Sequence, residues 1–367
     1  MIRPQRNGAQ DLLNLASMTQ KRDSTSLQST PGLDPSHIIE VGTGFWRSKT
    51  LLSAVELDLF SVLGAESMSG EEVGARLGLH QRAIVDFLDA LVALGFLERD
   101  GQGLKGRYRN SAKAAAFLDK HSPTYVGGFL ELCNARLYGV WGELTEALKT
   151  GEPQSEVKLK PFFEEIYSDP AKLEQFMHAM SGLSRGDFHA LAERFDFGRY
   201  HTVCDVGGAT GRLCTTLAGR YPHLRCTTYD QPVVAPIAER TITAAGLSDR
   251  VAVASGDFFT QALPEADVIT MAHILHDWNL DRKKQLISAA YDALPDGGAF
   301  IVVEHLIDDA RRDNVFGLTM SLTMLLTFGD AFDFTGSDFA GWCRDAGFGD
   351  IEILPLTGIT SAGIAYK

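Results

Sequence analysis

The sequence predicts an α/β protein in which a mostly parallel sheet follows a smaller, mainly helical domain. After residue 196, short apolar runs alternate with helical patterns, which is typical of a parallel sheet with helices on both faces. Between residues 67 and 115, two helical patterns precede a short hairpin pattern, as in a winged helix. The chain has 367 residues, too many for one ordinary core, so two or three units are expected.

Four segments are expected along the chain. Residues 1–35 are rich in Ser, Thr, Gln and Asn and predict a flexible arm with one short helix near Leu12–Met18. Residues 36–122 predict the mainly helical domain, and residues 123–195 predict a helical connecting segment. Residues 196–367 predict the domain that contains the sheet.

Composition restricts the class of protein. The net charge of −13 argues against a nucleic-acid partner, because an acidic chain repels phosphates. The five cysteines are odd in number and none has CxxC spacing, which argues against a disulfide framework or a zinc ribbon and favours the reducing cytoplasm. No segment offers about 18 uninterrupted apolar residues and none resembles a signal peptide, so no membrane partner is expected.

The mainly helical domain begins with an apolar stretch, residues 38–63, that predicts a helix buried on most sides, in this subunit or against a partner. Ser69 to Glu72 then begins a helix with acidic residues in its first turn, and Gly78 ends it. A second helix ends near Leu94, and a hairpin over 96–110 completes the winged helix. The second helix carries two Asp and one Arg where a DNA-reading helix needs basic residues, so a structural or dimerising module is expected.

The sheet is expected to contain seven strands. Five apolar runs predict its parallel part, and the last two runs lie close enough together to form an antiparallel edge. The runs are 202–206, 226–230, 251–254, 267–272, 300–304, 351–355 and 362–366. In sheets of this kind, ligands bind at the carboxyl ends of the parallel strands.

The first of these strands ends in a glycine-rich loop. Asp205-Val206-Gly207-Gly208-Ala209-Thr210-Gly211 leads into a helix, and its glycines let a ligand approach the backbone closely. The spacing is not the G-x-G-x-x-G of nicotinamide dehydrogenases, which argues against that class. An acid two residues before the first glycine suits a cationic ligand better than a pyrophosphate. By itself the loop is compatible with a nucleoside cofactor or with a structural turn.

Acids at the next two strand ends favour the cofactor. Asp230 follows the glycines by about one βαβ step, where a carboxylate accepts hydrogen bonds from ribose hydroxyls. Asp257 is placed to accept from an adenine amino group, and Phe258 to lie against the ring. Asp257 is also compatible with a plain helix cap. Acids at three consecutive strand ends are harder to explain by capping and favour an adenosine-containing ligand.

The fourth strand end supplies a candidate base. His276 lies on the ligand side of the sheet, and imidazole can take a proton from a hydroxyl near neutral pH. Asp277 and Trp278 are expected to begin the next helix and fix the ring, and Glu304, one strand over, is placed to hold its other nitrogen. The alternative is a packing or capping histidine. His273 and His276 with Asp277 also suggest a metal site, but no third ligand has predictable spacing, so no metal is predicted.

With these residues in place, the chain resembles the small-molecule S-adenosylmethionine-dependent O-methyltransferases, the family of the plant caffeate and flavonoid enzymes and of bacterial antibiotic-tailoring enzymes. The resemblance covers residues 36–367. It rests on DVGGATG at 205–211, on HDW at 276–278 and on DAGF at 345–348. Residues 166–181 also look like the helical segment that lies over the methyl-transfer site in that family.

The resemblance implies a Rossmann-like methyltransferase domain at 196–367, a winged-helix dimerisation domain before it, a homodimer, and S-adenosylmethionine as cofactor. It implies that His276 is the general base, assisted by Glu304, with a second assisting acid aligned with Asp333. Many members have glycine where Ala209 stands. The candidate cofactor residues are Asp205, Gly207, Gly208, Gly211, Asp230, Asp257, Phe258 and Ser184.

The acceptor is expected to be a small flat apolar molecule, aromatic or polyketide-like, that is methylated on a hydroxyl. The candidate substrate residues are Met177, Met180, Asp277, Met324 and Phe328, and Leu325, Leu326 and Phe332 are further candidate walls, since Met adapts to irregular shapes. The stretch 316–328 is equally compatible with plain core or dimer contact. N- or C-methylation, a repurposed reaction and a ligand-sensing winged-helix regulator are the alternative functions.

Overall fold

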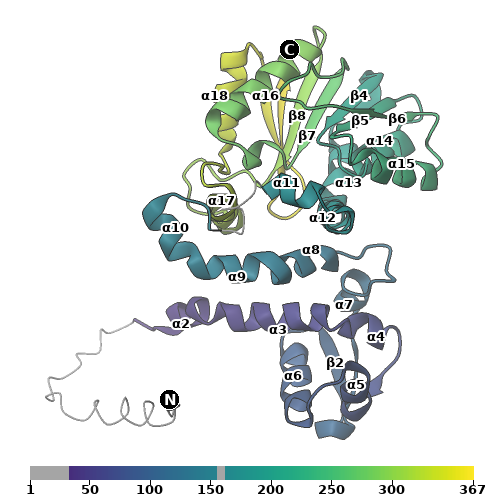
Figure 1. Ribbon diagram of the computed structural model, residues 1–367, viewed down its shortest axis with the longest axis vertical. Coiled ribbons are helices and arrows are strands. Elements are labelled where there is room, and N and C mark those ends of the chain that lie inside the picture. Colours follow the sequence, from purple (N-terminus) through teal and green to yellow (C-terminus); the bar gives the residue numbers. More distant parts are fainter. Residues whose placement is uncertain (1–32, 155–161) are drawn as a thin grey trace, which may run out of the picture. The chain divides into compact units, whose positions relative to one another are not determined.

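The computed structural model describes residues 33–154 and 162–367 (Figure 1). Most of the arm predicted over 1–35, including its helix near Leu12–Met18, therefore lies outside the described residues. The chain divides into two compact units, residues 1–47 and 48–367. The described part of the first unit holds α2 (Ser36–Gly42) and the start of α3 (Gly44–Glu56). The division predicted at residues 122 and 195 stays a prediction.

The apolar stretch at 38–63 is three helices rather than one. These are α2, α3 and α4 (Leu59–Leu63), and Asp58 separates the last two in a left-handed conformation with φ of 59°. Within the single chain the first part of this stretch is not buried, so burial against a partner stays a prediction for it. The side chains that are exposed in the single chain are Ile38, Ile39, Val41, Phe45 and Trp46.

The winged helix forms as predicted. Its elements are β1 (Met68–Ser69), α5 (Gly70–Leu77), α6 (Gln81–Ala93), β2 (Leu97–Asp100) and β3 (Arg107–Asn110), with a short 3-10 turn at Gly103–Lys105 and α7 (Ala112–Phe117) after it. Ser69 and Glu72 form a reciprocal capping box that fixes the start of α5. The strands pair in the order β1-β3-β2 over a core that includes Leu88, Leu91 and Tyr108.

A helical segment connects this domain to the sheet. It comprises α8 (Gly127–Leu132), a π-helical turn (Cys133–Leu137), α9 (Tyr138–Val140), a 3-10 turn (Trp141–Glu143), α10 (Leu144–Thr150), α11 (Phe162–Tyr167), α12 (Pro170–Leu183) and α13 (Arg185–Arg194). Asp169 caps α12, and Pro170 at its first position suits a helix start. Helix α12 packs against α8.

The seven-stranded sheet has the order β6-β5-β4-β7-β8-β10-β9, with β10 antiparallel to both its neighbours. The strands are β4 (Thr202–Val206), β5 (Arg225–Asp230), β6 (Val251–Ser255), β7 (Val268–Ala272), β8 (Ala299–Glu304), β9 (Ile351–Pro355) and β10 (Ser361–Tyr366). This confirms the predicted fold class. Strand order reverses between β4 and β7, which is where a doubly wound sheet binds its ligand.

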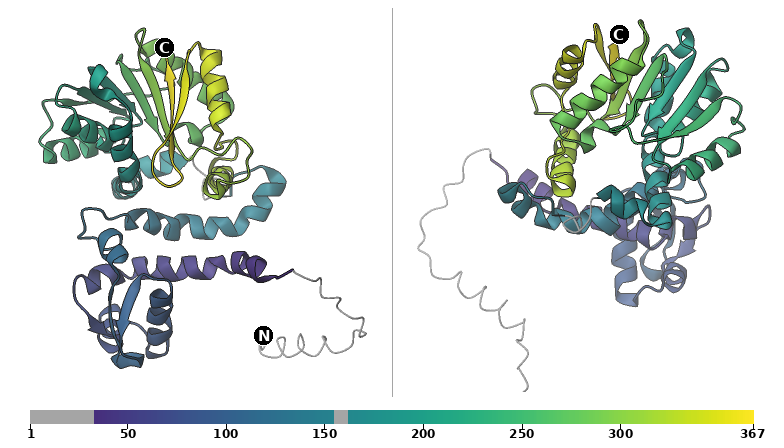
Figure 2. Two further views of the ribbon diagram at one scale, coloured as in Figure 1. Left: turned by 180° about the vertical axis from the view of Figure 1, so that it is seen from behind. Right: turned by 45° about the horizontal axis from the view of Figure 1, so that its top comes forward.

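Helices cover both faces of the sheet (Figures 1 and 2). On one face lie α13, α14 (Arg212–Arg220) and α15 (Ala235–Ala244); on the other lie α16 (Leu280–Ala293) and α18 (Gly336–Ala346). A short 3-10 turn (Phe197–Arg199) precedes β4, and α17 (Val315–Phe328) follows β8. None of the described helices combines the length and the hydrophobicity that a bilayer crossing needs.

One helix start differs from the prediction. Asp277 lies in a 3-10 turn (Leu275–Asp277) and Trp278 is extended, so neither begins α16. Asn279 is the N-cap, and its side chain accepts a hydrogen bond from the Arg282 N–H. Asn is a stronger capping residue than the sequence reasoning allowed for, and it moves the helix start past the HDW triplet.

Candidate active site

A cavity of about 270 Å³ opens at the carboxyl ends of the parallel strands. It is lined by the glycine-rich loop after β4, by the residues that follow β5, β6 and β7, and by faces of α12 and α17. The predicted site residues that line it are Asp205, Gly207, Gly208, Asp230, Asp257, Phe258, Ser184, Met177, Met180, His276, Asp277, Met324 and Phe328. The fold therefore brings to one place residues that lie up to about 150 positions apart in the chain.

The glycine-rich loop needs its first two glycines for packing. Gly207 has φ of 71°, and a Cβ there would lie 2.2 Å from the Ile274 Cδ1 atom. A Cβ on Gly208 would lie 2.2 Å from the Thr228 hydroxyl oxygen. The loop backbone can therefore lie tightly over the strand ends only with glycine at both positions. Gly211 does not line the cavity. It is the N-cap residue of α14, so it serves the conformation of the helix start and does not contact a ligand in the cavity.

Ala209 and Asp230 join the loop to the second strand. Asp230 ends β5, and its carboxylate accepts hydrogen bonds from the N–H groups of Ala209 (2.9 Å) and Gln231 (2.7 Å). Ala209 has φ of 49°, a left-handed conformation that costs a residue with a Cβ about 1–2 kcal/mol. The position where many family members have glycine thus keeps a glycine conformation here.

Buried acids define the cofactor end of the cavity. Burial raises the pKa of Asp205 to about 7, although the Thr270 hydroxyl donates to it at 2.7 Å. Burial also raises the pKa of Asp230 to about 6. A cationic ligand or hydroxyl donors would stabilise both carboxylates. Asp257 accepts from the Phe259 N–H at 2.9 Å in a turn, not at the start of a helix as the capping alternative required, and it also lines the cavity.

Two arginines beside the loop were missed by the sequence reasoning. Arg212 begins α14 and lines the cavity, and Arg185 begins α13. The Nε atom of each is buried without a hydrogen-bond partner among the described residues. Burial and the neighbouring Arg185 both lower the pKa of Arg212. Two close guanidinium groups of this kind suit a carboxylate ligand.

His276 lies at the cavity wall with acids on both sides of its ring. Its Nδ1 atom is 3.3 Å from the Asp333 Oδ1 atom and 4.0 Å from the Glu304 Oε2 atom. Its Nε2 atom is 3.4 Å from the Asp277 Oδ1 atom. Glu304 uses its other oxygen to accept the Leu275 N–H at 3.0 Å. Asp333 is therefore the hydrogen-bond partner of the ring, and Glu304 holds the backbone of the turn that carries it.

The carboxylates around His276 change its pKa more than burial does. Burial would lower the pKa of His276, but the carboxylates of Glu304, Asp277 and Asp333 outweigh burial and raise that pKa to about 10. Burial raises the pKa of Glu304 to about 7 and that of Asp277 to about 6. Lys283, fully buried with its ammonium over the Phe332 ring, has its pKa lowered by burial to about 8. The raised pKa values of His276, Glu304 and Asp277 mean that these three groups bind protons tightly when no ligand is bound.

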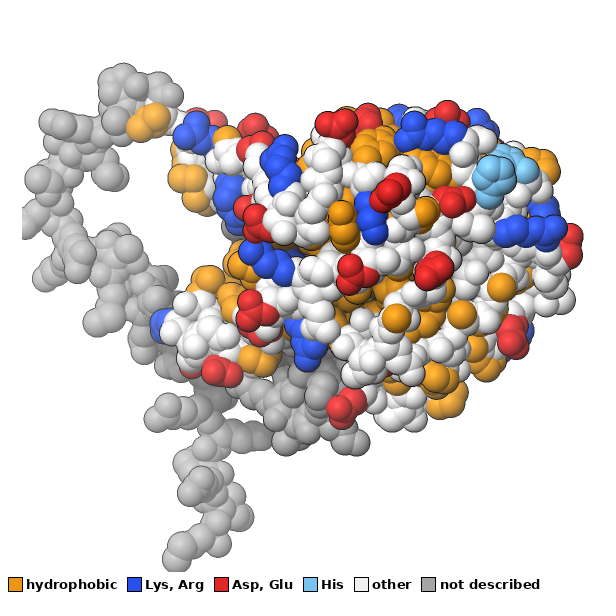
Figure 3. All heavy atoms as spheres, turned by 90° about the horizontal axis from the view of Figure 1, so that it is seen from above, with side chains coloured by type: hydrophobic (Ala, Val, Ile, Leu, Met, Phe, Trp, Pro, Cys, Tyr) orange, Lys and Arg blue, Asp and Glu red, His pale blue; other side chains and the backbone are white. Residues whose placement is uncertain are grey.

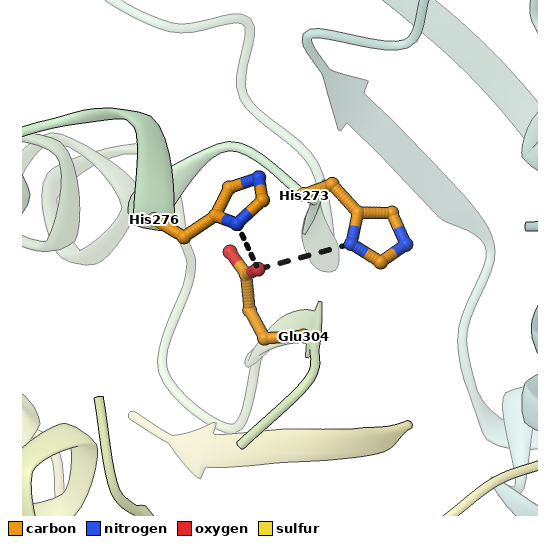
Figure 4. Close-up of side chains that lie close together, drawn as sticks. All are labelled: His273, His276 and Glu304. Atoms are coloured by element: carbon orange, nitrogen blue, oxygen red, sulfur yellow. Dashed lines mark ion pairs between the residues drawn. The ribbon is translucent and has the colours of Figure 1, made fainter. Parts of the chain in front are cut away.

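Figure 4 shows the rings of His273 and His276 turned toward the Glu304 carboxyl group. The Nδ1 atoms lie 3.9 Å and 4.0 Å from the Glu304 Oε2 atom, so Glu304 is a close third neighbour that sequence spacing did not reveal. The donor atoms of the three residues lie within 4.8 Å of one another, close enough for one cation to share. We assign the cluster to proton handling, because Asp333 and the Leu275 N–H already engage His276 and Glu304. The prediction of no metal stays a prediction.

The remaining walls are apolar. Helix α17 presents to the cavity residues spaced three or four apart, as one helix face requires: Met320, Thr323, Met324, Thr327 and Phe328. Leu325, Leu326 and Phe332 do not line the cavity, so those candidate walls were wrong. Leu326 is fully buried in the core, and Phe332, which follows α17, packs against the core beneath the Lys283 ammonium group. Phe163 of α11 stacks on Trp278 and on Phe328, with centroids 6.1 Å and 5.8 Å apart. A flat apolar ligand fits such walls.

Comparison with known proteins places the chain in a family. A model of the O-methyltransferase domain matches residues 141–349, and a model of the O-methyltransferase dimerisation domain matches residues 39–120. The chain belongs to the O-methyltransferase family. The predicted family, the S-adenosylmethionine cofactor and the enzyme class are thereby confirmed, and the winged helix lies within the family's dimerisation domain.

Relatives of this O-methyltransferase align over nearly its whole length. It is 40% identical over 333 residues to the tetracenomycin polyketide synthesis 8-O-methyl transferase of Streptomyces glaucescens, which covers 91% of this chain and 97% of that protein. It is 35% identical over 326 residues to an N,N-dimethyltransferase of Streptomyces rimosus, covering 88% and 93%. The crystal structure of human N-acetylserotonin methyltransferase with S-adenosylmethionine superposes with a TM-score of 0.84 at 26% identity, covering 92% and 99%.

Proposed function

We propose that this O-methyltransferase methylates a phenolic hydroxyl of a small polycyclic aromatic or polyketide-like molecule, with His276 as the general base. The observation that carries the proposal is His276 itself, at the wall of a largely apolar cavity with Asp333 behind its ring at 3.3 Å. The tetracenomycin enzyme, 40% identical, supports an acceptor of the polyketide class. The stacked rings of Phe163, Trp278 and Phe328 support a flat one.

The residues around the glycine-rich loop fit the cofactor. When bound, S-adenosylmethionine supplies a methyl group whose bond to a positively charged sulfur breaks as the acceptor oxygen bonds to the carbon. Asp230, Asp257 and Phe258 line the cavity; Asp230 would accept from ribose hydroxyls, Asp257 would accept from the adenine amino group, and Phe258 would lie against the adenine ring. Arg212, whose buried Nε atom has no partner among the described residues, would hold the carboxylate end. Asp205 contributes negative charge near the loop.

His276 would take the hydroxyl proton on its Nε2 atom. The Nδ1 proton is donated to Asp333, which fixes the ring and stabilises the imidazolium that forms. Because the surrounding carboxylates raise the pKa of His276 to about 10, Nε2 must first lose the proton that it holds at neutral pH. Asp277, 3.4 Å from Nε2 and lining the cavity, is the nearest carboxylate; because its pKa is only about 6, it would pass the proton on to solvent rather than keep it. The raised pKa then makes His276 a strong base.

Replacing His276 by Gln tests the assignment, because Gln keeps a polar side chain and cannot accept the proton. We expect turnover of a phenol panel to fall about 10²–10⁴-fold. The affinity for S-adenosylhomocysteine, measured by calorimetry, should stay within a few-fold of the wild type. Near-normal turnover in the variant would show that another group is the base.

A nitrogen acceptor is the second candidate, because a relative 35% identical to this chain is an N,N-dimethyltransferase. The carboxylates of Asp277, Asp333 and Glu304 near the cavity would also attract an amine. Incubation with labelled S-adenosylmethionine and matched phenol and aniline acceptors separates the two. Transfer of label to the aniline alone would replace oxygen by nitrogen in the proposal.

We further propose a homodimer that acts in the cytoplasm and does not bind nucleic acid. The exposed apolar residues of the dimerisation domain, Ile39 and Trp46 among them, support the dimer. All five cysteines are free, which suits a reducing compartment. Acidic and basic side chains are interspersed on the face shown in Figure 3, without a basic stripe for a phosphate backbone. A gel shift at physiological salt and light scattering test these points; specific DNA binding would favour a regulator instead.

A further inference from the structure

His273 has a left-handed backbone conformation that few residues with a Cβ adopt. It follows β7 directly and has φ of 54°, a left-handed conformation that Gly or Asn adopts more easily. Its N–H donates to the Val303 carbonyl at 3.0 Å, which fixes the backbone. Residues held in such conformations cluster at binding sites, where the surrounding structure maintains them for the side chain they present.

The imidazole of His273 is buried without a full set of partners. The side chain is 8% exposed and lines the same cavity as His276, and its Nε2 atom has no hydrogen-bond partner among the described residues. Its Nδ1 atom is 3.9 Å from the Glu304 Oε2 atom, too far for a hydrogen bond. A buried polar nitrogen of this kind is costly unless a ligand completes it.

A second histidine stands beside it. The ring centroids of His273 and His305 are 5.0 Å apart, and His305 also lines the cavity. The Nδ1 atom of His305 lies 3.1 Å from the Thr360 hydroxyl, and its ring meets the edge of Phe316. His305 is thus held by Thr360, just before β10, and by α17, while His273 faces the Glu304 oxygen that also faces His276 without a hydrogen bond to it.

The two histidines differ from His276 in charge. Burial lowers the pKa of His305 to about 4, and burial, His305 and His276 lower the pKa of His273 well below its usual range. Both imidazoles are therefore neutral at physiological pH. A neutral imidazole offers one donor and one acceptor, which matches a hydroxyl or a carbonyl oxygen and not an ion.

We propose that His273, with His305 beside it, recognises a second oxygen of the acceptor, a hydroxyl or carbonyl on the ring position next to or peri to the hydroxyl that His276 deprotonates. The ring centroids of His273 and His276 are 5.9 Å apart, so each ring can meet one of two neighbouring oxygens. The inference rests on the proposed function and adds to it: the acceptor is a dioxygenated aromatic, and His273 is a residue that determines specificity.

The test compares 1-naphthol with 1,8-dihydroxynaphthalene, which differ by one peri hydroxyl. We expect the wild-type enzyme to prefer the diol by about 5- to 100-fold in kcat/KM, because only the diol completes the His273 hydrogen bonds. His273→Phe should bring that ratio close to one. His273→Asn, which retains a donor and an acceptor and tolerates the left-handed backbone, should keep part of the preference. His189→Phe, at an exposed histidine of α13, is the matched control and should leave the ratio unchanged.

Binding of both phenols to the enzyme with S-adenosylhomocysteine is measured by calorimetry in parallel, so that a variant with slow turnover is still informative. Methylation of both phenols without discrimination by the wild type, or an unchanged ratio in a folded His273→Phe variant, overturns the role of His273 alone. Absence of both binding and methylation for both phenols overturns the proposed aromatic acceptor class, and the recognition role with it. A His273→Phe variant that does not fold leaves the decision to His273→Asn, for which an undiminished preference supports the role and a ratio of one opposes it.

Discussion

Replacing Asp333 by Asn tests which carboxylate holds the catalytic imidazole. The Asp333 Oδ1 atom lies 3.3 Å from His276 Nδ1, whereas Glu304 approaches only to 4.0 Å. A hydrogen bond to a charged group contributes about 1.5–3 kcal/mol, so loss of the charge should lower the maximal kcat about 10- to 100-fold. Glu304→Gln keeps an oxygen for the Leu275 N–H and should lower the maximal kcat less.

The same two variants should change the pH dependence. Turnover requires neutral His276, so in the wild type it should rise with pH toward the pKa of about 10 that the carboxylates produce. Removing a negative charge destabilises the imidazolium, so the pKa of His276 falls, by about 1–3 units for a close partner. The rising limb should therefore move to lower pH in both Asp333→Asn and Glu304→Gln, while the plateau falls mainly in Asp333→Asn.

The assay is the initial rate of methyl transfer with saturating cofactor across the neutral and alkaline range. Asp350→Asn, an exposed acid near the C-terminus, is the matched control and should leave both the limb and the plateau in place. Should Glu304→Gln lower the plateau more than Asp333→Asn does, Glu304 would be the orienting acid and the hydrogen-bond argument would be refuted.

Three further predictions follow from single features. Arg212→Met should weaken S-adenosylhomocysteine binding about 10- to 100-fold by calorimetry, because it removes a charged hydrogen bond. Arg220→Met, at the other end of α14, should leave that affinity unchanged. Equal affinities of the two variants would exclude the carboxylate role of Arg212. Ala209→Gly should raise Tm by about 1–4 °C, because glycine relieves the left-handed strain at φ of 49°, and a lower Tm would show that no strain is stored there. The raised pKa of His276 contributes stability that is fully present below its usual value of 6.5 and is lost as pH rises through about 10, so urea unfolding should show a decline over that range that His276→Gln reduces.

The sheet was predictable because its pattern is local. Buried parallel strands are short apolar runs bounded by turn residues, and the runs at 202–206 and 300–304 lie on β4 and β8. The glycine-rich loop was predictable from its local glycine pattern, although the atoms that require Gly207 and Gly208 belong to Ile274 after β7 and Thr228 of β5. The helices of the stretch at 38–63 were less predictable, because composition cannot show that Asp58 has a left-handed backbone conformation that divides the stretch.

The partner of His276 could not be read from the sequence. Strand order placed Glu304 next to the histidine, and this is correct at 4.0 Å, but which acid accepts the hydrogen bond from the ring depends on side-chain length and on the loop after α17. Asp333 lies 57 residues from His276 and reaches the ring from that loop. Arg212 was missed, and His273 was considered only as a metal ligand, because the significance of each is a buried nitrogen atom without a partner among the described residues, which no spacing reveals.

Acidic and basic groups lie in different parts of the cavity, and this separation determines which ligand groups each part can bind. Buried acids at the ends of β4 and β5 favour a cation, and the arginines at the starts of α13 and α14 favour a carboxylate, so the two ends of an amino-acid sulfonium can be told apart. Around His276 the carboxylates make a strong base but also hold its proton, so catalysis must wait until that proton leaves. The pair His273 and His305 stays neutral, because burial and the neighbouring His276 lower both pKa values, so it can recognise a second oxygen of the acceptor without competing for that proton. Discrimination between acceptors and removal of the proton are thereby assigned to different histidines, which is why variants at His273 and at Asp333 should change different kinetic quantities.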